Sequence, residues 1–149
     1  MNPNKTTIEV LLVDDDADDR STFADALSEL KINTNLTLLE DGRNLLQYLE
    51  SAERLPDILF LDLNMPYKSG VECLREIRDH SKFNDLSIAI YSTSSTDKDI
   101  EDTFIYGANI YIKKPNNFAK LKKVLSDVVN MNFQFHNSGL NKETFLLNI

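Results

Sequence analysis

Side chains that could carry out chemistry follow four short apolar segments of the sequence. The aspartates from Asp14 to Asp16 follow the first segment and Asp62 follows another, while Ser92 and Lys114 follow two later ones. Clustered carboxylates raise one another's pKa unless a cation lies between them. Mg²⁺ takes oxygen ligands and often acts beside phosphate oxygens. The acidic residues therefore indicate a divalent cation site.

The remaining groups fit the transfer of a phosphoryl group. Lys114 offers a positive charge and Ser92 a hydrogen-bond donor, and phosphoryl transfer is catalysed mainly by positioning and charge neutralisation. A carboxylate can act as the nucleophile and give an aspartyl phosphate. Asp62 is the candidate, because it stands alone after its apolar segment.

Alternating strands and helices must bring these groups together. Apolar runs typical of buried parallel strands cover residues 8–13, 36–39, 58–61, 88–91 and 110–112. Apolar residues with helical spacing lie around residues 23–30, 45–52, 71–77, 100–104 and 118–128. Five strand–helix units predict an α/β fold, a parallel sheet with helices on both faces. Such sheets bind ligands beyond the carboxyl ends of their strands, where the four groups are expected.

Length, charge and cysteine content limit the possible functions. The 149 residues fit one domain, and a formal net charge of −8 argues against nucleic-acid binding. With Cys73 as the single cysteine, no intramolecular disulfide can form, so we expect a cytoplasmic protein. We also expect no secretion signal or membrane span. The predicted organisation is a polar N-terminus (1–7), a domain (8–130) and a C-terminal tail (131–149).

The motifs of this chain resemble the receiver domains of bacterial two-component response regulators, in particular single-domain, chemotaxis-regulator-like ones. The resemblance runs from about Ile8 to Val129 and rests on Leu11–Asp16, Phe60–Pro66, Tyr91–Thr93, Gly107–Ala108 and Tyr111–Pro115. It implies a flavodoxin-like, doubly wound sheet with strand order 2-1-3-4-5. It also implies a stand-alone phosphoacceptor switch rather than an enzyme, one that promotes its own phosphorylation and dephosphorylation.

The resemblance assigns roles to the acidic residues and their neighbour. Asp62 would be the phosphoacceptor and a metal ligand. Asp15 would bind Mg²⁺ directly and Asp14 through water. Asn64 would offer its backbone carbonyl to the metal.

The same resemblance assigns roles to the residues that would respond to phosphorylation. Ser92 and Lys114 would bind the phosphoryl oxygens, and Pro115 would follow Lys114 in a cis peptide. Tyr111 would change rotamer when Ser92 moves. The implied phosphodonor is a histidine kinase or phosphotransfer protein. The signal would reach a downstream protein or a homodimer through the fourth helix, fifth strand and fifth helix, which are residues 97–106, 109–112 and 117–129.

Four other interpretations fit fewer residues. A pseudo-receiver, which binds partners without phosphorylation, is the main alternative. A haloacid dehalogenase-type phosphatase would need an acid where Asn64 stands, and a calcium loop would need glycine where Asp19 stands. A flavin or nucleotide site would need a glycine-rich loop. As in most charge runs, we expect Asp18 and Asp19 to form a solvated surface, with Asp16 near the rim of the site.

Overall fold

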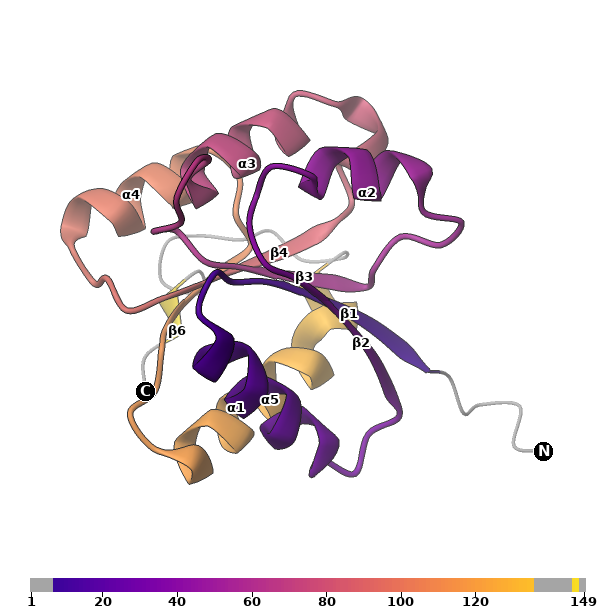
Figure 1. Ribbon diagram of the computed structural model, residues 1–149, viewed down its shortest axis with the longest axis vertical. Coiled ribbons are helices and arrows are strands. Elements are labelled where there is room, and N and C mark those ends of the chain that lie inside the picture. Colours follow the sequence, from indigo (N-terminus) through magenta and orange to yellow (C-terminus); the bar gives the residue numbers. More distant parts are fainter. Residues whose placement is uncertain (1–6, 136–145, 148–149) are drawn as a thin grey trace.

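A six-stranded sheet forms the middle layer of the computed structural model, which describes residues 7–135 and 146–147. Its strands are β1 (Ile8–Val13), β2 (Thr34–Leu39), β3 (Ile58–Leu61), β4 (Ser87–Ser92), β5 (Ile110–Lys113) and β6 (Leu146–Leu147). They lie in the order β2-β1-β3-β4-β5-β6, and all neighbouring strands are parallel (Figure 1). The order predicted for the first five strands is confirmed.

Strand β6 extends the predicted sheet by one strand. Leu146 and Leu147 pair with Tyr111 and Ile112, so β6 lies along the edge of β5. An unpaired edge would expose the backbone donors and acceptors of β5, and β6 satisfies part of them. Two apolar residues show no periodicity, so the sequence pattern could not predict this strand.

Five α-helices cover the two faces of the sheet. They are α1 (Ala17–Ser28), α2 (Leu45–Ser51), α3 (Gly70–Arg78), α4 (Asp97–Ile105) and α5 (Phe118–Phe135), and a 3₁₀ turn, η1, spans Ser81–Phe83. Helices α1 and α5 lie on one face, and α2, α3 and α4 on the other (Figure 1). None of the described helices is long and apolar enough to cross a membrane.

Both faces of the central strands are buried, which explains their continuous apolar sequences. In β1, Val10 and Leu12 pack in the core beneath α1 and α5, whereas Leu11 and Val13 pack in the core beneath α2, α3 and α4. The alternation follows from the two-residue period of a strand. Slipping a strand by one residue would exchange the two sets of side chains, so the packing helps to fix the register.

Helix α5 begins at Phe118, as the predicted apolar stripe does, but it extends further than predicted at its C-terminal end. It crosses the boundary predicted at residue 130 and continues to Phe135, and Met131 packs against the core. Phe118, predicted as the first residue of the apolar stripe, is 38% exposed, while Val124 and Val129 are buried instead. The division into a domain (8–130) and a tail (131–149) stays a prediction.

Candidate functional site

The carboxyl ends of β1 and β3 bring Asp14 and Asp62 together. The two strands are neighbours, with Val13 paired to Leu61, and each is followed by its aspartate. The Asp62 N–H donates to the Val13 carbonyl at 3.0 Å. The chain leaves β1 towards one edge of the sheet and β3 towards the other, so this is the point where such a sheet binds ligands.

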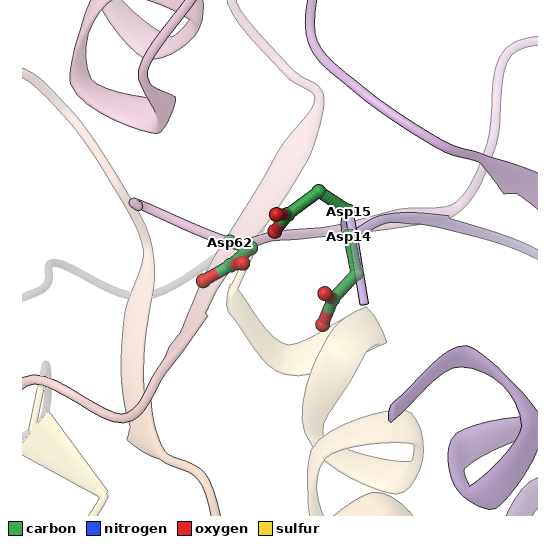
Figure 2. A group of neighbouring side chains, drawn as sticks. All are labelled: Asp14, Asp15 and Asp62. Carbon is green, nitrogen blue, oxygen red and sulfur yellow. The ribbon is translucent and has the colours of Figure 1, made fainter. Parts of the chain in front are cut away.

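Three carboxylates form a compact group at this point. Ligand oxygens of Asp14, Asp15 and Asp62 all lie within 4.8 Å of one another. Figure 2 shows the three side chains as neighbours. Asp14 and Asp62 are buried and Asp15 is exposed. The structure thus brings together the three aspartates predicted as ligands.

One oxygen of this group indicates how a cation would fit. Asp14 Oδ1 accepts a hydrogen bond from the Asp16 N–H at 2.9 Å. Asp14 Oδ2 is buried and makes no directed hydrogen bond to any described residue. Its close partner is the Lys114 ammonium group at 2.8 Å, and a hydrated Mg²⁺ would give this buried acceptor a further partner. Asn64 is exposed in the loop after β3, and the predicted use of its backbone carbonyl stays a prediction.

Burial makes Asp62 hard to ionise in the absence of a cation. Burial is the largest effect, and together with the charge of Asp14 it outweighs Lys114 and raises the pKa of Asp62 to about 7. A cation among the carboxylates would favour their charged forms. Binding of a divalent metal and ionisation of Asp62 are therefore linked.

Lys114 reaches the same group from the end of β5. Its Nζ lies 2.8 Å from Asp14 Oδ2, 2.8 Å from Asp19 Oδ2 and 3.8 Å from Asp62 Oδ2. Burial alone would lower the pKa of Lys114, but the surrounding carboxylates outweigh it and raise the pKa. The expectation that Asp19 is a solvated surface residue is wrong, because the start of α1 directs its side chain to Lys114.

The peptide bond after Lys114 differs from the prediction. The part of the chain that the structure describes contains no cis peptide bond, so the bond to Pro115 is trans. In this conformation the Lys114 N–H donates to the Ser92 carbonyl at 2.8 Å and its side chain reaches Asp14. A bond to proline prefers trans by roughly 0.5–1 kcal/mol, and these contacts form without the less stable isomer.

The two predicted switch residues both contact Ser94. Ser92 is buried, and its Oγ accepts a hydrogen bond from the Ser94 N–H at 3.1 Å. Tyr111 is fully buried, and its hydroxyl donates to the Ser94 carbonyl at 2.8 Å. Ser94 Oγ in turn donates to Asp99 Oδ2 at 2.5 Å, on the first turn of α4. The sequence does not reveal this contact of Asp99, because acids are common in the first turn of a helix, where the helix dipole favours them.

The loop between β3 and α3 passes close to Asp62. A Cβ on Gly70 would collide with the backbone of Asp62 and Leu63, so this position requires glycine. The Gly70 N–H donates to the Leu63 carbonyl at 2.8 Å, and a capping box between Ser69 and Glu72 starts α3 there. Tyr67, in the same loop, has a φ of 68°, which is a strained conformation for a bulky residue. The start of α3 is therefore packed directly against the predicted phosphoacceptor.

Comparison with known proteins identifies the family. The model for the "Response regulator receiver domain" family matches residues 10–126, most of the chain. The chain belongs to this family. This receiver domain is 29% identical over 133 residues to the response regulator Rcp1 of Synechocystis sp., covering 85% of this chain and 88% of that protein.

Solved structures agree with this assignment. The phosphorylated cyanobacterial phytochrome response regulator RcpA is 26% identical, with a TM-score of 0.79 over 86% of this chain and 95% of that chain. The Mn²⁺-bound form of response regulator Rcp1 is 25% identical, with a TM-score of 0.74 over 90% of this chain and 99% of that chain. Receiver domains are phosphoacceptor switches of two-component systems, bind a divalent metal and interact with histidine kinases or phosphotransfer proteins. The acidic group of this receiver domain fits Mg²⁺.

Proposed function

We propose that this receiver domain accepts a phosphoryl group on Asp62 and signals through protein contacts. The supporting observation is the position of Asp62, which is buried beside two further carboxylates and lies 3.8 Å from Lys114. The donor would be a phosphohistidine of a histidine kinase or a phosphotransfer protein. A pseudo-receiver would instead bind its partner proteins without phosphorylation, and Asp62 would then have no role as a phosphoacceptor.

In the proposed reaction a carboxylate oxygen of Asp62 attacks the phosphorus of the phosphohistidine. An O–P bond forms as the P–N bond breaks, and the imidazole leaves. Asp15 would hold Mg²⁺ directly and Asp14 through water, and Asn64 would contribute its backbone carbonyl. When bound, Mg²⁺ would supply charge neutralisation at the phosphoryl oxygens. Lys114 contributes the second positive charge, and later hydrolysis of the acyl phosphate by water resets the switch.

The signal would pass from Ser92 to Tyr111 and α4. A phosphoryl oxygen on Asp62 attracts the Ser92 hydroxyl, which in this structure accepts from the Ser94 N–H. Ser94 also bonds Tyr111 and Asp99, so movement of the loop alters the contacts of β5 and of the start of α4. Phosphorylation would shift the balance between two packings of this region.

The proposed output surface is formed by α4, β5 and α5. Ile105 on α4 is 65% exposed and Phe118 on α5 is 38% exposed, so both helices present apolar side chains. Exposed apolar groups of this kind suit a downstream protein or a second copy of the chain. β6 lies against the β5 edge of this surface and would take part in it.

Phosphorylation by a small donor tests the proposal. Incubation with acetyl phosphate and Mg²⁺ should add one phosphoryl group to the intact mass of the wild type. Asp62→Asn and addition of EDTA should each prevent it, while Asp18→Asn, which removes an exposed acid, should leave it unchanged. A wild type that takes up no phosphoryl group, under conditions that preserve acyl phosphates, would favour the pseudo-receiver.

A further inference from the structure

The ammonium group of Lys114 is shared between carboxylates in the structure. Its Nζ lies 2.8 Å from both Asp14 Oδ2 and Asp19 Oδ2, but 3.8 Å from Asp62 Oδ2. Only the contact with Asp19 has the geometry of a directed hydrogen bond. The lysine expected to serve a phosphoryl group on Asp62 is thus held closer to two other acids.

Asp19 differs from Asp14 in its relation to the metal group. The three carboxylates that gather within 4.8 Å are those of Asp14, Asp15 and Asp62. A cation bound there would neutralise part of the charge of Asp14 and weaken its attraction for Lys114. Asp19 lies outside that group and would retain its full charge.

The start of α1 fixes the position of Asp19. The Asp16 side chain caps the helix and accepts a hydrogen bond from the Asp19 N–H at 3.0 Å. The Asp19 side chain is 40% exposed, whereas that of Lys114 is 9% exposed. A capped helix therefore presents a carboxylate to a nearly buried ammonium group 95 residues further along the chain.

We propose that Asp19 is a positioning residue that competes with the phosphoryl group for Lys114. In the unphosphorylated protein it holds the ammonium group away from Asp62. When a phosphoryl group occupies Asp62, Asp19 and the phosphoryl oxygens compete for the same ammonium group, so Asp19 weakens retention of the phosphoryl group. This inference rests on the proposed function, because it concerns the state in which Asp62 carries the phosphoryl group.

Beryllofluoride, a stable mimic of the phosphoryl group, provides the test. Wild type, Asp19→Asn and Asp18→Asn would be titrated with beryllofluoride at saturating Mg²⁺. Asp18 is the matched control, because it lies in the same helical turn and carries the same charge but is exposed. Partly exposed ion pairs are weak, so Asp19→Asn should bind roughly two- to fivefold more tightly than Asp18→Asn. Asp19→Glu, which keeps the charge, should bind more weakly than Asp19→Asn.

Two further measurements separate positioning from a structural effect. Mg²⁺ affinity without beryllofluoride should be no higher in Asp19→Asn than in Asp18→Asn, because a Lys114 released from Asp19 lies nearer the metal-binding carboxylates; tighter beryllofluoride binding then cannot come from tighter metal binding. In a Lys114→Gln background, Asp19→Asn should no longer strengthen beryllofluoride binding relative to Asp18→Asn, because the competition acts through Lys114.

The outcomes distinguish the two proposals. A wild type that binds beryllofluoride, with Asp19→Asn no tighter than Asp18→Asn, would overturn the role of Asp19 and leave the proposed function standing. An unchanged gain in the Lys114→Gln background would also overturn it. A wild type that binds no beryllofluoride in the presence of Mg²⁺ would overturn both.

Discussion

Without metal, the protein is expected to lose stability as the pH rises from about 4 to about 7, because burial raises the pKa of Asp62 to about 7. An unfolded chain releases this proton near pH 4. Between these values the folded state binds more protons than the unfolded state, so each step up in pH favours unfolding. The shift, which already includes the opposing effect of Lys114, corresponds to at most about 4 kcal/mol, and solvent screening reduces the expected contribution to roughly 2–3 kcal/mol.

Asp62→Asn isolates this effect. The variant should lack this loss of stability and should exceed the wild type at pH 8 by roughly 2 kcal/mol, while the two converge near pH 4. Urea unfolding in EDTA at several pH values measures the difference, and Asp18→Asn should follow the wild type. Equal pH dependence in wild type and Asp62→Asn would show that Asp62 ionises normally. Added Mg²⁺ should stabilise the wild type at pH 8 by mass action.

Arg78→Ala is expected to lower the free energy of unfolding by about 3 kcal/mol, because it removes four hydrogen bonds that a single, largely buried guanidinium group makes. The guanidinium group donates to the carbonyls of Gly107, Phe83 and Leu86 at 2.8–2.9 Å and to Asn109 Oδ1 at 2.9 Å. Burial lowers its pKa, so the charge is held there at some cost. These contacts join the end of α3 to the starts of β4 and β5. They lie at the amino ends of these strands, whereas the candidate site lies at the carboxyl ends.

Arg75→Ala is the matched control for Arg78→Ala. Arg75 lies on the same helix and is exposed, and its guanidinium carbon is 4.7 Å from the centre of the Tyr106 ring. Its loss should cost less than about 1 kcal/mol. Arg78→Lys should recover only part of the stability, since one ammonium group cannot reach all four acceptors. Chemical unfolding that shows equal losses for Arg78→Ala and Arg75→Ala would contradict the role given to Arg78.

The sheet and the acidic group were predictable because strand ends determine where side chains lie. Apolar runs identified β1 and β3, and each run is followed by an aspartate. Because neighbouring parallel strands end on the same side, the two aspartates had to meet beyond the carboxyl ends of these strands. Once parallel pairing was predicted, Asp14 and Asp62 could hardly lie apart. The same reasoning placed Ser92 and Lys114 at the carboxyl ends of their strands, where the Lys114 N–H donates a hydrogen bond to the Ser92 carbonyl.

The contacts of Asp19 and of β6 could not be predicted in this way. A run of acids at a helix start is usually solvated, and nothing local shows that one of them faces a lysine 95 residues away. The pairing of Leu146 with the edge of β5 depends on the path of the C-terminal segment rather than on a repeating pattern. The inward position of Tyr111 likewise depends on the Ser94 carbonyl, which no side-chain pattern reveals.

The measurement that tests the central claim most directly is the chemical location of the phosphoryl group. After incubation with acetyl phosphate and Mg²⁺, reduction with borohydride converts an aspartyl phosphate to homoserine, which peptide mass spectrometry can locate. Our account predicts homoserine at position 62 and at no other aspartate, with none formed in EDTA. Homoserine at Asp14, Asp15 or another aspartate, with Asp62 unchanged, would contradict it.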